Sequence, residues 1–329
     1  MNGPRIVDNQ VELVAIVNSF NRRSLLERAI ESLTESLRKA RFRWAIVVFE
    51  AGSNDGSAEY LKARREKAPG DNLFVIEASG ERRSFSDGVN EASAFAIAHF
   101  PNCRWLFLYE TDNCLMDVGP IEKAIALLEL EPRLAAVGFT VKQHDGRFFG
   151  YGMQFPSTLS FALGQNLAAL CKLHGPNNSA WHNSDGIRWR TCDAVFTSPL
   201  LVRRQAWEQS NGFDAANFPF SDTDLDWAWR CAKLGWKMAV IASESVVHDN
   251  LQQLSAWSAN RALDFHRNRL RLLKRHRGKY VTVLKPLLFL RHCLEALMLA
   301  RKSPNGRRAK EKLAKRTRML RTVWREYRE

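Results

Sequence analysis

Short apolar runs and amphipathic repeats alternate through the first third of the chain. The runs are rich in Val, Ile, Leu and aromatic residues, as buried β-strands are, and the clearest repeat spaces its Leu, Ile and Ala residues three and four positions apart, as a helix does. An alternation at this rhythm predicts parallel strands joined by crossover helices, which is an α/β fold. The predicted strands occupy residues 11–20, 44–50, 72–79 and 104–109, and the predicted helices occupy 22–40, 58–68 and 87–100.

Polar residues follow three of these predicted strands. They form the sequences NSFNRR at 18–23, FEAGSNDGS at 49–57 and YETDN at 109–113. Ligands of α/β proteins bind at the carboxyl ends of parallel strands. These three polar segments, which we call the polar exits of the strands, are therefore expected on one rim of the sheet, where together they would form a site.

The second half of the chain is less regular, with a loop-rich segment over 146–190. Further along, the stretch FPFSDTDLDWAWR at 218–230 places Asp222, Asp224 and Asp226 at alternate positions before a tryptophan-bearing helix. A solvated loop does not need the tryptophans, and a buried core does not tolerate unpaired carboxylates. This stretch is therefore a candidate for chemistry, with Trp227 expected either to pack in the core or to form an apolar wall for a ligand.

Charge divides the chain into two parts near Asn260. The whole chain carries a formal charge of +14, yet residues 261–329 hold 22 Lys/Arg and 5 Asp/Glu, a balance of +17, which leaves −3 for the rest. We therefore expect a catalytic domain over 1–260 and a basic helical extension over 261–329. Amphipathic, basic segments in the extension favour an anionic membrane surface as partner, and a solvent-exposed helix packed on the domain is the alternative.

Other sequence features bear on the compartment. The first ten residues have no apolar secretory core, and the six cysteines form no Cys-x-x-Cys pair, which favours a reducing cytoplasm. The most apolar segment, 280–300, is interrupted by Lys285, Pro286 and Arg291. It is expected to lie on a membrane rather than to cross it, so the protein is expected in the cytoplasm or peripherally at the inner face of the plasma membrane.

Two acids, Glu110 and Asp112, come directly after a predicted buried strand. Paired carboxylates at a strand end commonly hold a divalent cation that bridges two phosphates, although an exposed turn has the same appearance. The Gly-rich turn after Glu50 suits the close approach of a ribose or phosphate, but on its own it is a weak signal.

Five motifs in a fixed order carry a stronger signal. With them the sequence resembles glycosyltransferase family 2, from about Val11 to about Asn250. The matching residues are Ser19, Phe20, Asn21 and Arg22; Glu50 with Gly52, Ser53, Asp55, Gly56 and Ser57; Glu110, Thr111 and Asp112; Arg203, Arg204, Gly212, Phe213 and Asp214; and Asp222, Thr223, Asp224, Leu225 and Arg230, followed by His248.

The resemblance implies a GT-A fold, a mostly parallel mixed sheet flanked by helices, and an inverting glycosyltransferase. It implies that Asp222 is the general base, and that Mg²⁺ or Mn²⁺ is held by Glu110, Asp112 and His248. The implied partners are a nucleotide-diphosphate sugar, with UDP or dTDP as carrier, and a glycan or lipid-linked acceptor of surface-polysaccharide assembly. The residues expected near the substrate or nucleotide are Ser19, Phe20, Asn21, Arg22, Glu50, Gly52, Ser53, Asp87, Asn90, Thr111 and Trp227.

The sequence departs from the family pattern at three positions. Glu50 and Glu110 stand where the family usually has Asp, and Ser221 stands where it commonly has Glu. These changes leave a second hypothesis, a catalytically weak relative that binds a nucleotide or partner. A third, a nucleic-acid-binding protein, is suggested by the basic extension alone, but the sequence has no recognised nucleic-acid module, so no nucleic-acid partner is expected.

Overall fold

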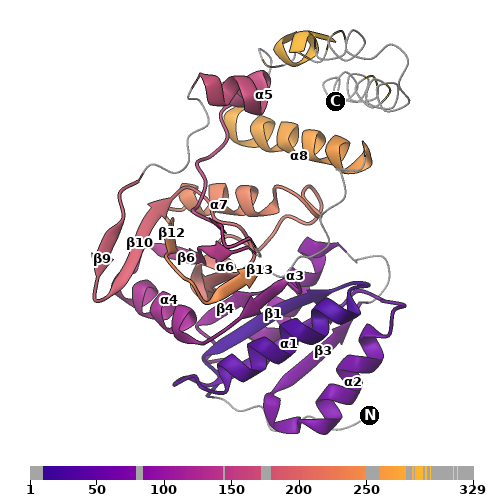
Figure 1. Cartoon of the computed structure of the whole chain (residues 1–329), viewed down its shortest axis with the longest axis vertical. Helices are drawn as coiled ribbons and strands as arrows, with labels where there is room; N and C mark the ends of the chain where they lie inside the picture. The colour runs from indigo at the N-terminus through magenta and orange to yellow at the C-terminus, as the bar shows by residue number, and fades with distance from the viewer. Residues whose placement is uncertain are drawn as a thin grey trace. The chain divides into compact units, whose positions relative to one another are not determined.

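The computed structural model describes residues 10–78, 84–143, 145–171, 179–248 and 259–278, with residues 284, 286–291, 293, 294, 297, 314 and 317 (Figure 1). The chain divides into two compact units. The first comprises Met1–Gln154 and Asn177–Leu251, and the second comprises Phe155–Pro176 and Gln252–Glu329. The second unit thus draws one segment, 155–176, from within the range that the sequence analysis gave to the catalytic domain.

A nine-stranded mixed sheet forms the centre of the first unit, in the order β3-β2-β1-β4-β11-β6-β12-β10-β9. The first four strands in this order are parallel, and β11 runs antiparallel between β4 and β6. The strands are β1 (Leu13–Ser19), β2 (Trp44–Glu50), β3 (Leu73–Glu77), β4 (Trp105–Leu108), β6 (Leu134–Phe139), β9 (His182–Ser184), β10 (Ile187–Cys192), β11 (Leu200–Arg203) and β12 (Lys237–Ile241).

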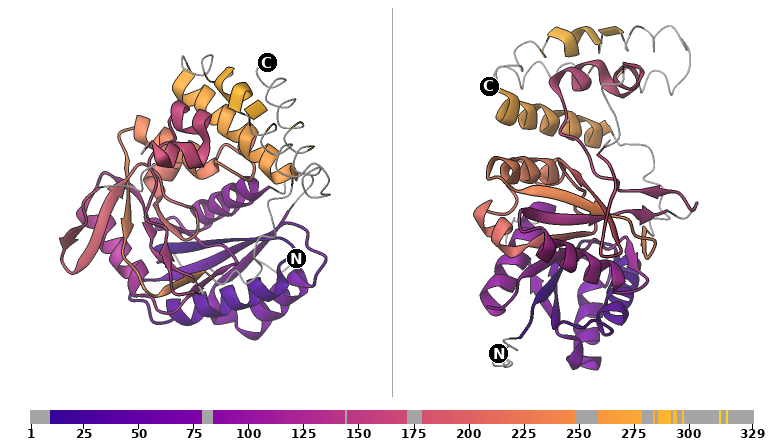
Figure 2. Two further views of the ribbon diagram at one scale, coloured as in Figure 1. Left: turned by 45° about the horizontal axis from the view of Figure 1, so that its top comes forward. Right: turned by 90° about the vertical axis from the view of Figure 1, so that its left-hand side faces the viewer.

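Helices cover both faces of this sheet. Right-handed crossovers from β1 to β2 and from β2 to β3 place α1 (Arg23–Leu37) and α2 (Ser57–Lys67) on one face. The chain then reverses direction along the sheet, so α3 (Phe85–His99) lies on the opposite face as it leads to β4 (Figures 1 and 2). Three further helices pack on strands beyond β4: α4 (Gly119–Leu130), α6 (Arg204–Gln209) and α7 (Thr223–Lys233).

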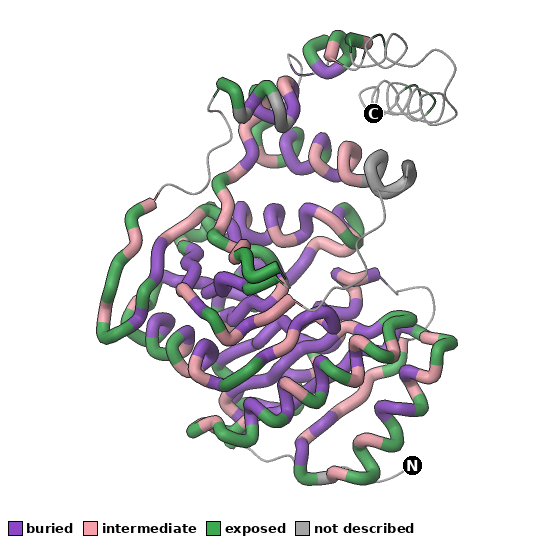
Figure 3. Tube along the Cα trace, in the orientation of Figure 1, coloured by how far each residue is buried: buried purple, intermediate pink, exposed green. Residues whose placement is uncertain are grey.

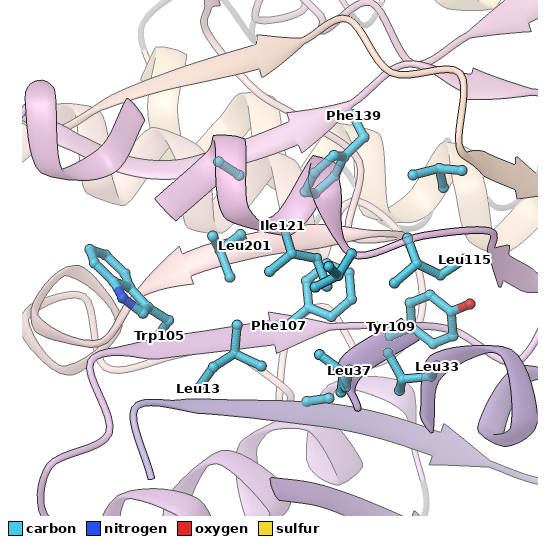
Figure 4. Packing of buried hydrophobic residues seen from close by; sticks show 14 of the residues in the cluster. Leu13, Leu33, Leu37, Trp105, Phe107, Tyr109, Leu115, Ile121, Phe139 and Leu201 are labelled. Carbon is cyan, nitrogen blue, oxygen red and sulfur yellow. The ribbon is translucent and has the colours of Figure 1, made fainter. Parts of the chain in front are cut away.

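The apolar repeat of the first helix becomes the buried face of α1. Its leucines Leu33 and Leu37 point toward Tyr109 and Leu115 in a cluster that also contains Phe107 (Figure 4). The central strands are buried on both faces, whereas α1 alternates buried and exposed positions (Figure 3). This difference explains why the strands read as continuous apolar runs and the helix as a periodic one.

A second, four-stranded sheet lies at the carboxyl ends of the central strands, in the order β5-β13-β7-β8. Its members are β5 (Asn113–Leu115), β7 (Val141–Lys142), β8 (Phe148–Phe149) and β13 (Val246–His248). Antiparallel pairing of β13 with β5 places His248 opposite Asn113. The last residue of the final strand is thereby brought next to the acids that follow β4.

A buried ion pair and an aromatic cluster hold α7 against the preceding loop. The Asp226 side chain is fully buried, and its Oδ2 accepts a hydrogen bond of 2.8 Å from Nε of Arg230. The same guanidinium donates to the backbone oxygens of Ser210 and Gly212. The arginine of the acidic motif is therefore a structural clamp.

The second unit is helical in its described residues. It contains α5 (Thr158–Leu170), which is interrupted by non-helical Gly164, and α8 (Ala259–Arg277). Phe161 contacts His266 with ring centroids 5.4 Å apart, which packs the two helices together. Among the described residues, no helix has both the length and the hydropathy required to span a bilayer.

Replacing Arg230 with Met is expected to lower the free energy of unfolding by about 3–5 kcal/mol, because it leaves the buried Asp226 charge without its partner. Urea denaturation of the purified variants measures this. The matched control is Arg104→Met, which breaks an ion pair with Glu129 that is about half exposed and is expected to cost less than about 1 kcal/mol. Equal losses for the two variants would contradict the assignment.

Candidate active site

The strand order reverses between β1 and β4, because β2 and β3 extend the sheet to one side of β1 and the later strands extend it to the other. Such a switch point opens a crevice at the carboxyl ends of the strands. Ser19 ends β1 opposite Glu50 at the end of β2, and the amide of Tyr109, just past β4, bonds to β1. The three polar exits therefore lie on one rim, as the strand–helix rhythm predicts.

The turns after β1 and β2 brace each other. The backbone N–H of Asn21 donates to Ser53 Oγ at 2.9 Å, and the N–H of Asn54 donates to Asn21 Oδ1 at the same distance. Asn21 and Gly52 both have positive φ, 50° and 82°, which asparagine and glycine adopt at lower cost than other residues. Phe20 is exposed at the tip of its turn. Asn21 and Gly52, which match the family pattern, therefore allow these two turns to form side by side. We call the two hydrogen-bonded turns, residues 20–22 and 51–56, the double turn.

Glu50 lies at the base of this double turn with part of its carboxylate unused. Its Oε1 accepts a hydrogen bond of 2.6 Å from the N–H of Ser53. Its Oε2 is buried and has no hydrogen-bond partner among the described residues, and the same is true of Ser19 Oγ. Leaving a buried acceptor unpaired costs free energy, which suits a group that pairs with a ligand.

Asp112 lies between two cationic or potentially cationic side chains. It is only 6% exposed, and its Oδ2 lies 3.6 Å from Nη1 of Arg22 and 3.6 Å from Nε2 of His248. The ring of Phe149 packs edge-on against the His248 ring, with centroids 5.6 Å apart. Asp112 Oδ1 has no hydrogen-bond partner among the described residues.

Glu110 is the most electrostatically perturbed acid in this group. Its pKa is raised to about 7, first by desolvation and then by the Asp112 charge, while a hydrogen bond of 3.1 Å from Thr197 Oγ1 acts in the opposite direction. Asp224 also contributes to the upward shift of this pKa. Asp224 at the start of α7 therefore lies within electrostatic reach of Glu110 after β4.

Asp222 occupies the N-cap of α7 in an unusual conformation. Its φ and ψ are 59° and 10°, and its side chain makes no capping hydrogen bond to the helix. A non-glycine residue held in the left-handed region commonly marks a functional site. The residue is 7% exposed.

The loop that carries Asp222 is tied to β1 through the start of α3. Ser86 donates from its N–H to the Pro219 oxygen at 3.0 Å and from its Oγ to the Phe218 oxygen at 2.6 Å. The preceding residue of α3, Phe85, accepts a hydrogen bond of 3.1 Å from Asn18 Nδ2. Two hydrogen-bonded steps therefore connect the Asp222 loop to the end of β1.

Several other expected site residues have structural contacts. Asp87 accepts from Ser84 in a capping box at the start of α3, and Asn90 exchanges two hydrogen bonds with the backbone of Phe213. Thr111 is buried. Trp227 is 1% exposed and donates from Nε1 to Ser210 Oγ, with rings of Trp207 and Phe213 around it, which are the contacts of a packing residue. Arg82 and Arg83 precede α3 in the sequence, where a pair of bases is expected to be solvated or to contact a phosphate; both lie outside the described residues.

Sequence reasoning did not find Thr197, Ser86 or Asn18. Thr197 is 87 residues away from the Glu110 side chain that it binds, and Ser86 is 132 residues away from Phe218. Isolated Ser, Thr and Asn residues carry no pattern, so only the tertiary structure reveals these contacts.

Glu110, Asp112 and His248 have the side-chain types that bind a hard divalent cation. Among the described residues, however, no three His, Cys, Asp or Glu side chains are arranged as a complete metal site. Mg²⁺ is commonly held by one or two carboxylates and completed by substrate phosphates. The unpaired Oδ1 of Asp112 and the raised pKa of Glu110 are consistent with an incomplete site of this kind.

Comparison with solved structures shows the fold. The mannosyltransferase PcManGT from Pyrobaculum calidifontis, in complex with GDP-Man and Mn²⁺, aligns with a TM-score of 0.56 and 16% identity over 95% of this chain and 86% of its own. GalNAc-T7 with UDP, GalNAc and Mn²⁺ aligns with a TM-score of 0.54 and 12% identity over 81% of this chain and 48% of its own. The expected GT-A fold is confirmed.

Sequence comparison shows the family. The N-acetylglucosaminyl-diphospho-decaprenol L-rhamnosyltransferase of Mycobacterium tuberculosis, from two strains, is 26% identical over 203 residues, which are 59% of this chain and 64% of that protein. Residues 14–184, more than half of the chain, match the profile of glycosyl transferase family 2. This range contains the double turn and the Glu110–Asp112 acids, and the chain belongs to glycosyl transferase family 2.

Proposed function

We propose that this chain transfers a sugar from a nucleoside diphosphate donor to an acceptor hydroxyl, with inversion at the anomeric carbon. The observation that carries the proposal is the meeting of Arg22, Asp112 and His248 at the switch point, with Asp224 of α7 in electrostatic reach of Glu110. Family membership supports the reaction class.

The donor nucleotide is proposed to bind over the double turn after β1 and β2. Glu50 Oε2 would accept a hydrogen bond from the ring N–H of uracil or thymine, which favours a UDP- or dTDP-sugar. Ser19 and Ser53 flank this position. The diphosphate would then extend toward Arg22, whose guanidinium is suited to phosphate oxygens.

Asp112, Glu110 and His248 are proposed to hold Mg²⁺ or Mn²⁺ against the diphosphate. When bound, the cation would neutralise charge on the leaving nucleoside diphosphate. His248 would contribute an imidazole nitrogen, and its ring packs against Phe149.

Asp222 is proposed to accept the proton of the acceptor hydroxyl. As that oxygen bonds to the anomeric carbon, the bond from this carbon to the diphosphate oxygen breaks, and its electron pair leaves with the diphosphate. A one-step attack from the face opposite the leaving group inverts the sugar. The Asp222 side chain makes no capping hydrogen bond to α7.

The acceptor is proposed to be a lipid-linked or polysaccharide glycan of the cell envelope, met on the cytoplasmic side. The name of the mycobacterial relative specifies L-rhamnosyl transfer to a sugar on diphospho-decaprenol. We extend the lipid-linked acceptor class to this chain, and a hexosyl or deoxyhexosyl donor with it.

Replacing Asp222 with Asn is expected to lower kcat by about 10²–10⁴-fold with little change in donor affinity, because the base is lost while the left-handed backbone remains accessible to asparagine. Donor sugars carried by UDP, dTDP and GDP are assayed for released nucleoside diphosphate and for transfer. Asp185→Asn, in the exposed β9–β10 turn, is the matched control. Transfer at the full rate by the Asp222 variant would refute the mechanism, and an inactive wild-type protein that still binds nucleotide would indicate the catalytically weak relative.

Replacing Asp112 with Asn is expected to weaken Mn²⁺ binding by roughly tenfold or more, since changes in the outer shell alone cost about 10–100-fold. The readout is the free Mn²⁺ signal in electron paramagnetic resonance, with and without nucleoside diphosphate. Asp117→Asn, five residues along on an exposed loop, serves as the control. An unchanged affinity would remove Asp112 from the metal site.

Glu110 is expected to make the cation-free protein less stable as pH rises. Its folded pKa of about 7 exceeds the unfolded value of 4.5, so the folded state binds more protons in this window and stability falls from about pH 4.5 until the loss is complete above pH 7. Glu110→Gln should therefore gain about 1–2 kcal/mol more over wild type at pH 8 than at pH 5. Urea denaturation in EDTA measures the difference, and an equal gain at both pH values would contradict it.

A further inference from the structure

Exposed apolar side chains gather in the second unit. The described residues include fifteen large hydrophobic side chains classed as exposed, and eight of them belong to this unit although it holds far fewer of the described residues. Isolated exposed leucines are ordinary, but a concentration of them marks an interaction surface. The eight are Leu159, Leu167 and Leu170 in α5, and Leu287, Phe289, Leu290, Leu294 and Leu297.

Four of these residues form what we call the leucine ridge: Leu287, Leu290, Leu294 and Leu297. All four are helical, and they are between 41% and 58% exposed. Their spacing of three, four and three residues places them along one side of a helix. Among the described residues, these four leucines therefore form an apolar strip.

A different side of the same helical segment is already packed. Leu284 and Leu288 are buried, and Arg291 Nη1 donates a hydrogen bond of 2.9 Å to the Phe161 oxygen of α5. These three residues lie four and three positions apart, on a side of the helix that is adjacent to the ridge. Packing within the unit therefore uses one side of the segment and leaves the ridge at the surface.

Basic side chains in the same unit accompany the ridge. In α8, Leu270, Leu272 and Leu273 are buried, whereas Arg271 and Lys274 are exposed. Arg275 and Arg277 are exposed as well. The part of the chain from Arg261 onward has an excess of seventeen positive charges, 22 bases against 5 acids.

The combination of the leucine ridge with exposed bases favours one kind of binding partner over others. A nucleic acid would use the bases but has no need of an aliphatic strip. A second copy of the chain would bring another strongly positive surface close to the first, and like charges oppose such association. An anionic bilayer satisfies both features, since its headgroups attract the bases and its acyl boundary accepts the leucines.

We propose that the second unit docks on an anionic phospholipid bilayer, with the leucine ridge inserted at the headgroup–acyl boundary and the exposed bases of α8 at the phosphates. The docking goes beyond electrostatic attraction of a basic tail, because the ridge supplies apolar area that salt does not screen. It does not depend on sugar transfer, since none of the residues in the proposed active site takes part.

The test uses the full chain and vesicles of phosphatidylcholine, with or without about one third phosphatidylglycerol. Wild type is expected to float with the anionic vesicles and to raise the surface pressure of a monolayer of the same composition. The ridge variant replaces all four leucines with Gln, which preserves helix propensity. It is expected to bind roughly tenfold or more weakly and to lose the pressure increase.

The matched control replaces Leu130 and Leu234 with Gln, because both are half-exposed leucines of the catalytic unit. This control should bind vesicles as wild type does, and both variants should release nucleoside diphosphate from the donor at the wild-type rate. The proposal is overturned if wild type does not float with anionic vesicles at low salt. It is also overturned if the ridge variant floats with them as well as wild type does. A ridge variant that only converts a dimer to a monomer, or tighter binding to DNA than to vesicles, overturns it as well.

Discussion

Glu110 is buried beside Asp112 at one rim of the sheet, and desolvation, followed by the charges of Asp112 and of Asp224 in α7, raises its pKa. Carboxylates in a desolvated crevice repel each other unless positive charge is brought between them. In the protein itself, Arg22 provides that compensation on one side of Asp112. In the function proposed above, a cation and a nucleoside diphosphate sugar would complete it, and the electrostatic cost of bringing the acids together would be offset by their interaction with the cation.

The surrounding framework keeps these groups in place against their repulsion. The Asp222 loop is connected through Ser86 and Phe85 to the end of β1, and the Arg230 clamp fixes the helix that follows. Pairing of β13 with β5 places His248 beside Asp112. The Ser86, Phe85 and β13–β5 connections join segments far apart in sequence, which fixes the positions of the site residues relative to one another.

The two units differ in their physical character. Residues up to Asn260 are nearly neutral, and the central sheet buries its apolar residues on both faces, whereas the second unit is basic and keeps leucines at its surface. In the function proposed above, a folded core would bind the water-soluble donor, and a basic, apolar surface would meet the lipid that carries the acceptor. Because these two properties belong to different units, the apolar residues of the first unit can be buried while leucines and bases of the second unit stay exposed.

The sequence by itself determined the α/β class, the order of the early strands and helices, and the motifs that identify the family. Continuous apolar runs and helical periodicity are local properties, and the ends of parallel strands meet on one rim by geometry alone, which is why Ser19, Glu50 and Glu110 could be grouped in advance. Only the tertiary structure decided that Trp227 packs in an aromatic cluster, that Asn90 serves the backbone of Phe213, that Thr197 binds Glu110, and that 155–176 joins the C-terminal unit. These outcomes depend on contacts between distant segments, and a single side chain carries no local signal of the partner that folding will bring to it.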